Sequence, residues 1–158
     1  FFKIRESRMA GSKIQPELHR TAVPKDLLIG LERTMCPGAC PDYSLFIHGD
    51  GRVVYEGRHY VAVKGSRKTR ISKASVKRLF DEFYGTDFFL LKDRYDRVAS
   101  DGAITKTSIR ADGRKKEVVN CHPSQAPEEL YHLEKMIDEV ARSVRWIRDK
   151  SGKPALKP

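Results

Sequence analysis

The sequence has no long apolar run, few cysteines and none of the common catalytic motifs. Its longest apolar stretches, such as Phe88 to Leu91, fall far short of the roughly 20 residues that a membrane-spanning helix needs. Only 3 of the 158 residues are cysteine, and a chain of this length can bury a core without a disulfide framework. We therefore expect one ordinary globular domain with tails, and no transmembrane segment in the visible chain.

The chain also lacks the patterns that mark common enzymes and cofactor sites. It contains no Gly-x-Gly-x-x-Gly, no His-Glu-x-x-His and no Gly-x-Ser-x-Gly, which are the signatures of dinucleotide, zinc-protease and hydrolase sites. The 5 histidines show no paired spacing. We find no catalytic constellation, and we expect a non-enzymatic protein without a cofactor.

Charge is unbalanced, with 31 Lys and Arg against 21 Asp and Glu and a formal net charge of +10. Six basic and three acidic residues lie in 1–26, and five basic residues and one acidic residue lie in 145–158. Between these segments the basic surplus is only three. A surplus of this kind affects association but identifies no site by itself. Because most of it lies in the two ends, we expect basic arms that dock on an acidic protein or a membrane complex.

Local patterns predict an α+β domain over 27–148, between an extended basic arm at 1–26 and a basic tail at 149–158. Alternating hydrophobicity on both sides of an Asp-Gly pair predicts hairpins at 43–55 and 104–121. Further strands are expected at 27–34 and 60–64.

Two amphipathic helices complete the expected fold. Ser72 is a suitable N-cap for a helix over 73–84, and Pro127 suits the first turn of a second helix whose apolar face continues to Ile147. The order strands, helix, strands, helix predicts an antiparallel sheet built from hairpins, with two helices packed on one face.

The segment Leu31–Leu45 carries the pattern Cys-x-Gly-x-Cys-Pro-x-Tyr, and Gly49-Asp50-Gly51 and the strand at 53–57 follow it. On these residues the chain resembles the bacterial domain-of-unknown-function family number 6438, over about residues 28–148. The resemblance implies an exported or lipid-anchored bacterial module, and no activity is established for the family. Cys121 and His122 stand where the family more often has other residues, so a site built on them would be particular to this protein.

Cys36 and Cys40 flank a Pro-Gly turn, so their Cα atoms can approach the separation of about 5.5 Å that a disulfide needs. A disulfide fits an exported protein, because such bonds persist in oxidising compartments. The alternative is a pair of reduced, buried cysteines. The disulfide is the favoured hypothesis, with a short closed loop that shapes the chain before Tyr43.

A second hypothesis places a metal at the cysteines. Cys36, Cys40, Cys121 and His122 are the donor types of a Cys₃His zinc site. Adjacent Cys121 and His122 are awkward as simultaneous ligands, and no second Cys-x-x-Cys pair supports them, so zinc is disfavoured. A redox role is also weak, because the spacing is not Cys-x-x-Cys.

Seven basic residues and no acidic residue lie between Lys64 and Arg78. Such a segment offers contacts to phosphates, but no aromatic residues are interleaved to stack on bases. An acidic protein partner is therefore favoured over nucleic acid. The candidate partner-binding residues are Phe1, Phe2, Lys64, Arg67, Lys68 and Arg70.

These observations predict a protein-interaction module, exported or periplasmic or membrane-associated, that serves as an accessory or structural subunit. It would dock on a larger protein assembly through its arms, and a signal or anchor ahead of Phe1 is compatible with this hypothesis. The alternatives are a nucleic-acid or anionic-surface binder that uses 64–78, and a cysteine-centred metal or thiol protein.

Overall fold

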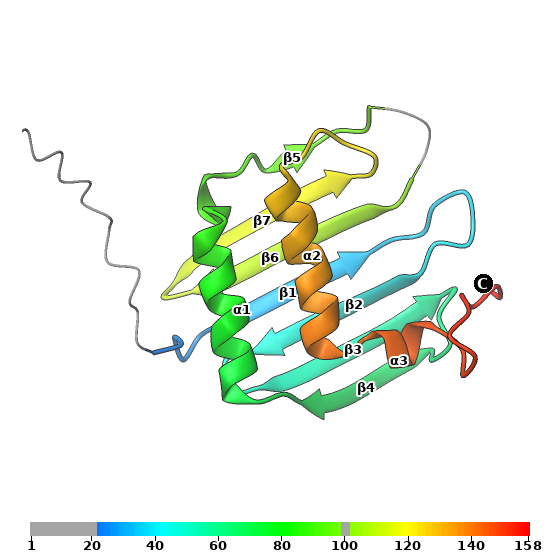
Figure 1. Ribbon diagram of the computed structural model, residues 1–158, viewed down its shortest axis with the longest axis horizontal. Coiled ribbons are helices and arrows are strands. Elements are labelled where there is room, and N and C mark those ends of the chain that lie inside the picture. The colour runs from blue at the N-terminus through cyan, green and yellow to red at the C-terminus, as the bar shows by residue number, and fades with distance from the viewer. Residues whose placement is uncertain (1–21, 99–101) are drawn as a thin grey trace, which may run out of the picture.

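Two helices lie across one face of a seven-stranded sheet in the computed structural model, which describes residues 22–98 and 102–158 (Figure 1). The strands are ordered β4-β3-β2-β1-β6-β7-β5. Neighbouring strands run antiparallel, except that β5 is parallel to β7. The predicted α+β fold, with an antiparallel sheet and two main helices on one face, is confirmed.

The first four strands form a meander. They are β1 (Leu28–Arg33), β2 (Asp42–His48), β3 (Arg52–His59) and β4 (Gly65–Arg70). The hairpin between β2 and β3 turns at Gly51, whose φ of 93° is open to glycine and strained for other residues. An Asp-Gly turn was therefore a sound signal here.

Helix α1 (Lys73–Gly85) starts at the predicted cap, where the Ser72 side chain accepts a hydrogen bond from the Ser75 amide. A short 3-10 helix, η1 (Phe88–Leu90), then buries Phe88. The second half contains the strands β5 (Arg94–Tyr95), β6 (Ile104–Ala111) and β7 (Arg114–Cys121), followed by the helices α2 (Glu128–Ala141) and α3 (Val144–Ile147).

The strand expected at 60–64 is wrong, because β4 begins only at Gly65. Tyr60 has a positive φ of 53° and leaves the extended conformation. The amides of Ala62 and Val63 then donate to the carbonyls of Ile147 and Trp146, far away in the sequence. This segment therefore packs against α3 instead of joining the sheet.

The single long helix expected from Pro127 to Ile147 is also wrong. Arg142 adopts a left-handed conformation, with φ at 53°, and ends α2. The Ser143 amide donates to the Asp138 carbonyl, which closes the helix end. The apolar spacing continues into α3 because both helices lie over the same sheet, although residues 142–143 interrupt the helical conformation between them.

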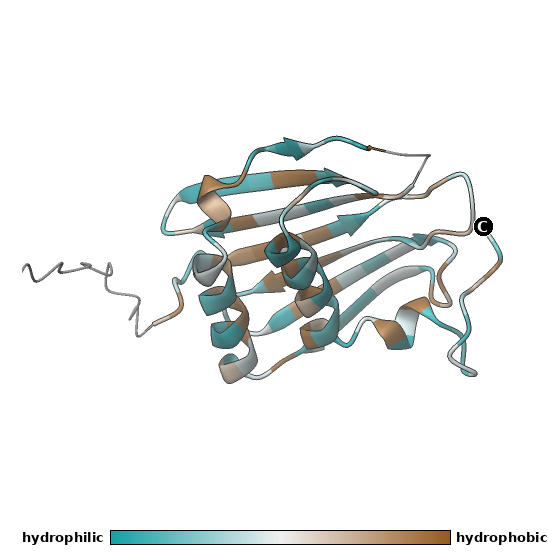
Figure 2. Ribbon diagram, turned by 45° about the horizontal axis from the view of Figure 1, so that its top comes forward, coloured by the Kyte–Doolittle hydropathy of each residue, from teal (hydrophilic) through white to brown (hydrophobic). Residues whose placement is uncertain are grey.

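The core lies between the sheet and the helices. Strand alternation sends one set of side chains from β1, β2 and β3 toward the helices, and the hydropathy colours alternate along these strands (Figure 2). The helices contribute buried residues at helical spacing to the same core: Val76, Leu79, Phe80, Phe83, Leu130, Leu133, Ile137 and Val140. This contact holds the two layers together through apolar burial.

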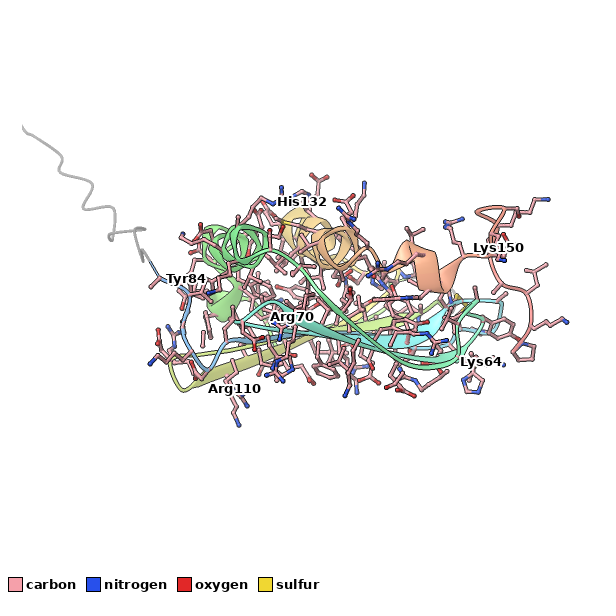
Figure 3. All side chains as sticks on the ribbon, turned by 90° about the horizontal axis from the view of Figure 1, so that it is seen from below. Lys64, Arg70, Tyr84, Arg110, His132 and Lys150 are labelled. Atoms are coloured by element: carbon pink, nitrogen blue, oxygen red, sulfur yellow. A yellow bond between two sulfur atoms is a disulfide. The ribbon has the colours of Figure 1, made fainter. Side chains whose placement is uncertain are left out.

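The other face of the sheet has no helix over it, and we name it the open face. Figure 3 views the layers edge-on, with His132 on the outer side of the helix layer and Arg110 on the open face. Residues 149–158 make a local turn closed by a β-bridge between Arg148 and Pro154, and the Pro158 carbonyl accepts from Lys64 of the domain. Within 22–98 and 102–158, no helix is long and apolar enough to cross a membrane.

Candidate functional site

The predicted disulfide between Cys36 and Cys40 is confirmed, with their Cα atoms 5.4 Å apart. It closes the loop between β1 and β2, next to Pro41. The Gly38 amide donates to the Cys36 sulfur at 3.3 Å. Since both sulfurs are bonded to each other, neither is a free thiolate in this structure.

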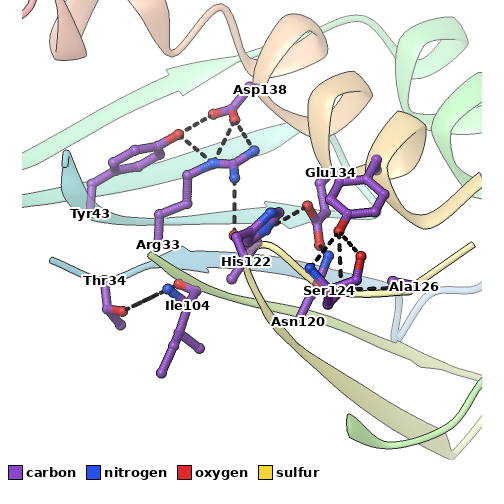
Figure 4. Close-up of polar contacts among 12 residues, drawn as sticks. Arg33, Thr34, Tyr43, Ile104, Asn120, His122, Ser124, Ala126, Glu134 and Asp138 are labelled. Carbon is purple, nitrogen blue, oxygen red and sulfur yellow. Dashed lines mark hydrogen bonds and ion pairs between the residues drawn. The ribbon is translucent and has the colours of Figure 1, made fainter. Parts of the chain in front are cut away.

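Cys121 is buried at the end of β7 as a free thiol. The His122 Nε2 atom lies 3.0 Å from the Thr105 hydroxyl and 3.3 Å from a carboxylate oxygen of Glu134, under α2 (Figure 4). Across the described residues, no three His, Cys, Asp or Glu side chains gather as metal ligands would. The structure therefore does not bring Cys121 and His122 together with the disulfide as one site.

The predicted partner-binding residues are divided between different places. Phe1 and Phe2 lie outside the described residues. Lys64 precedes β4 and donates to the carbonyl of Pro158, and Arg67 bonds the Ser66 carbonyl at 2.8 Å. Lys68 and Arg70 alternate with Arg67 along β4, so they belong to the open face.

The basic segment 64–78 is likewise not one surface. Its first half forms the edge strand β4, whereas Lys73, Lys77 and Arg78 belong to α1 in the helix layer. Lys77 is paired with Asp81 one turn later, at 2.7 Å. Only the β4 half contributes to the open face.

Register across the sheet places Arg70 in a larger group. Arg70 pairs with Arg52, Leu28 lies between His48 and Arg110, and Arg110 pairs with Lys115. His48 and Arg52 flank the turn of the β2–β3 hairpin. We name this line of residues across one end of the open face the basic row: Arg70, Arg52, His48, Leu28, Arg110 and Lys115.

The next line of residues is largely apolar at its centre. Phe46 pairs with Gly30 on one side and Val54 on the other, and its side chain is 38% exposed. A Cβ on Gly30 would lie 2.4 Å from the Ser108 hydroxyl and 3.1 Å from the Phe46 ring. Glycine thus lets the aromatic ring lie on the open face beside the basic row.

One family model matches most of this fold. The family described as "Domain of unknown function (DUF6438)" matches residues 27–141. The chain belongs to the DUF6438 family. A comparison with curated proteins gives no significant match. The match ends at Ala141, so it covers the whole sheet and both main helices but not α3 or the tail.

At the opposite end of the open face, the DUF6438 domain carries acids that are already paired. Arg58 contacts Asp42 at 2.7 Å and Glu32 at 3.6 Å, and Asp42 also contacts His59 at 2.8 Å. Ser66 donates to Glu56 at 2.7 Å. Arg58 is thus shared by two of these carboxylates, and Glu56 has only the neutral Ser66 as its donor, so this end is more acidic than the basic row.

Three acids stand beside the basic row. Glu117 is exposed opposite Ser108, and Asp50 and Asp26 are held as anions by backbone amides. The Arg52 amide is the main cause that lowers the pKa of Asp50, which also forms a 2.8 Å ion pair with the Arg52 side chain. The amides of Gly113 and then Asp112 lower the pKa of Asp26. Asp50 and Asp26 shape the turns at this end of the sheet.

The remaining described cations of this end form no close ion pair, although Arg70 lies near enough to help lower the pKa of Asp50. Lys68, Arg70 and Lys115 are exposed, and no ion pair involves them in the part of the chain that the structure describes. Sequence reasoning found Lys68 and Arg70 from their local charge run. It missed Arg52, Arg110 and Lys115, because only the sheet register places these residues in one row with Arg70.

Proposed function

We propose that this domain is an exported, non-enzymatic protein-interaction module that docks an acidic protein surface on the basic row of its open face. The observation that supports it most is the pairing of like charges, Arg52 with Arg70 and Arg110 with Lys115. Like charges directly opposite each other destabilise a sheet. Sequences tend to break such local rules at functional sites.

The shape of the row also suits a protein. It crosses six strands, which at about 4.8 Å per strand spacing gives roughly 24 Å. Phe46 lies beside it and supplies the aromatic contact that often anchors a protein interface. Arg52 already pairs with Asp50 at 2.8 Å, so a bound acidic segment would relieve mainly the repulsion between Arg110 and Lys115.

Other occupants fit less well. A second copy of this chain would have to offer the acids at the far end of its open face, where Asp42 and Glu32 already contact Arg58 and only Glu56 has a neutral partner. Nucleic acid would need several stacking rings, and Phe46 is the one exposed ring of the strands on the described open face. Export is supported by the Cys36–Cys40 disulfide.

The test compares two variants with the same loss of charge. In the open-face variant, Lys68→Gln, Arg70→Gln and Lys115→Gln are combined. In the control variant, Arg142→Gln, Arg145→Gln and Arg148→Gln are combined on the helix side. The probe is a polyglutamate peptide, with affinity measured by fluorescence anisotropy over a range of salt concentrations.

We expect the open-face variant to bind polyglutamate about tenfold more weakly or worse, and the control to keep most of its affinity, since each charged contact contributes 1 kcal/mol or more. The proposal fails if both variants lose affinity equally, or if a single-stranded oligonucleotide or an anionic vesicle binds the wild type more tightly than the peptide. Self-association abolished by the open-face substitutions would also contradict it.

A further inference from the structure

A cleft opens on the helix side of the molecule, where the disulfide loop, the end of α2 and α3 meet. Its volume is about 940 Å³. This cleft is separate from the open face, because its residues come from the opposite face of the sheet and from the helices. Arg33 and Tyr43 of the sheet and Asp138 of α2 contribute to its lining.

The floor of the cleft is a closed polar cluster (Figure 4). One Asp138 oxygen accepts from Arg33 Nε at 3.1 Å and Nη2 at 3.0 Å, and the other accepts from the Tyr43 hydroxyl at 2.7 Å and the Ser143 hydroxyl at 2.6 Å. Each carboxylate oxygen therefore has two donors. The floor charges are compensated before any ligand arrives.

The protonation of this cluster follows from the same contacts. Burial, followed by the Asp138 charge, raises the pKa of the Tyr43 phenol far above its usual value, so Tyr43 stays a donor. Burial has the largest single influence and would lower the pKa of Arg33, but Asp138, Tyr43 and Glu134 together reverse it, so the net shift is upward. Arg33 and Asp138 thus form a fixed ion pair.

A second cluster supports this floor from behind. Arg33 Nη1 donates to Thr105 at 3.0 Å, Thr105 contacts His122, and His122 contacts Glu134. Glu134 in turn accepts from Asn120 at 3.0 Å. The side chains that line the cleft floor are therefore held in place by a continuous chain of contacts, which is how a site is preorganised.

The rim of the cleft differs: Lys135 and Glu139 pair with each other at 3.7 Å, and three arginines remain uncompensated. Arg142, Arg145 and Arg148 are spaced three residues apart where α2 gives way to α3, and all three are exposed and line the cleft. Arg145 lies over the Trp146 ring at 4.2 Å, and Arg148 donates to the Gly152 carbonyl at 3.0 Å. No acidic side chain pairs with any of the three among the described residues.

One wall of the cleft is apolar. Pro41, Ala103, Val144 and Ile147 contribute to it, beside the Cys40 half of the disulfide. Val144 is 56% exposed, which is high for a large aliphatic residue. A concave site with an apolar wall and a few convergent charged groups is the usual form of a small-molecule site.

We propose that this cleft binds an amphiphilic organic anion, with one carboxylate or phosphate group held by the arginines of the rim and an alkyl body laid along the wall at Val144. Guanidinium groups match both oxyanions with paired hydrogen bonds. The floor contributes shape and not charge, because Arg33 is already occupied by Asp138. The ligand is therefore selected by its single anionic group and its apolar length together.

The experiment uses decanoate, decyl phosphate and the neutral decanol as probes, each below its aggregation limit, with binding measured by isothermal titration calorimetry. We expect one or both anions to bind the wild-type chain. The combined Arg142→Gln, Arg145→Gln and Arg148→Gln variant should bind about tenfold more weakly or worse. The open-face variant, which has lost the same charge, should bind as the wild type does.

A wall variant, Val144→Asp, gives an independent measurement at an exposed position. It should weaken both anions, since it places a like charge and removes apolar contact. Preference for decanoate would identify a carboxylate ligand, and preference for decyl phosphate a phosphate head group. The proposal is overturned if neither anion binds, if decanol binds equally well, or if the rim substitutions leave the affinity unchanged.

Discussion

The open face and the helix-side cleft are both rich in arginine, but their charges are compensated in different ways. In the cleft floor, Arg33 is partly buried and is matched by Asp138, Tyr43 and Thr105. On the open face, Arg70 and Lys115 are exposed and stand opposite other cations. Burial therefore separates the cations of these two regions. Covered cations hold the fold, and uncovered ones remain free to bind.

The largest expected effect comes from breaking the covered cluster with Asp138→Ala. Removal of this carboxylate leaves Arg33 partly buried without its counter-ion and also removes an acceptor from Tyr43. We expect a loss of about 3 kcal/mol in the free energy of unfolding, measured by chemical denaturation. A buried charge that has lost its partner keeps its desolvation penalty without the compensating attraction.

Lys68→Gln is the matched substitution on the open face, and it should change the same free energy by less than about 0.5 kcal/mol. Equal losses in the two variants would remove the distinction between structural and binding cations. A loss of under about 0.5 kcal/mol for Asp138→Ala would show that the cluster does not hold the two layers together.

A smaller effect is expected at the centre of the open face from Gly30→Ala. The new Cβ would meet the Ser108 hydroxyl and the Phe46 ring, and overpacking of this kind costs about 1 to 2 kcal/mol. Thermal or chemical unfolding measures the loss. Ser108→Ala removes the closer of the two contacts, so the double variant should recover part of the stability.

This double-mutant cycle separates crowding from a general intolerance of alanine in the strand. If the effects of Gly30→Ala and Ser108→Ala simply add, crowding against the Ser108 hydroxyl is not what requires glycine.

The smallest effect concerns the turns beside the basic row, through Asp26→Asn. The carboxylate of Asp26 accepts from the amides of Asp112 and Gly113, both at 2.8 Å, and these bonds lower its folded-state pKa below 3.8. A lowered pKa contributes stability above the unfolded value, and that contribution is lost as pH falls through the folded value.

Asp26→Asn should therefore lower the melting temperature at neutral pH, and the difference from the wild type should shrink as pH falls below 3.8. Exposed Asp87, in Asp87→Asn, serves as the control on the helix side. A difference that is independent of pH would mean that the charge of Asp26 does not stabilise the turn.

Much of the fold could be predicted from the sequence, because the signals were local. The Asp-Gly hairpins, the Ser72 cap and the disulfide between Cys36 and Cys40 each depend on a few neighbouring residues. The errors arose where distant contacts decide the conformation. The segment at 60–64 bonds to α3, and nothing in its own pattern indicates that partner.

The strand β4 and the break at Arg142 escaped prediction for related reasons. All six residues of β4, Gly65–Arg70, lack apolar side chains, because an edge strand beyond the helices has little core to face. The break between α2 and α3 occurs at Arg142, without a glycine or proline. The β4 strand therefore lacks the alternating apolar residues that indicate a strand, and Arg142 is not a residue type that usually ends a helix.

The candidate sites were the least predictable part. Arg33 and Asp138 are 105 positions apart, and Arg70 and Lys115 meet in one row only through the register of four intervening strands. The charge count suggested basic arms, whereas the described residues carry two cationic surfaces on the domain itself.

The central claim is that these two surfaces are separate sites with different ligands. It is tested most directly by one set of ¹H–¹⁵N spectra of the wild-type chain, titrated first with polyglutamate and then with decyl phosphate. The peptide should shift amides around Phe46 and Ser108, and the alkyl anion should shift a different set around Val144. If both probes move the same amides, the two-site account is wrong.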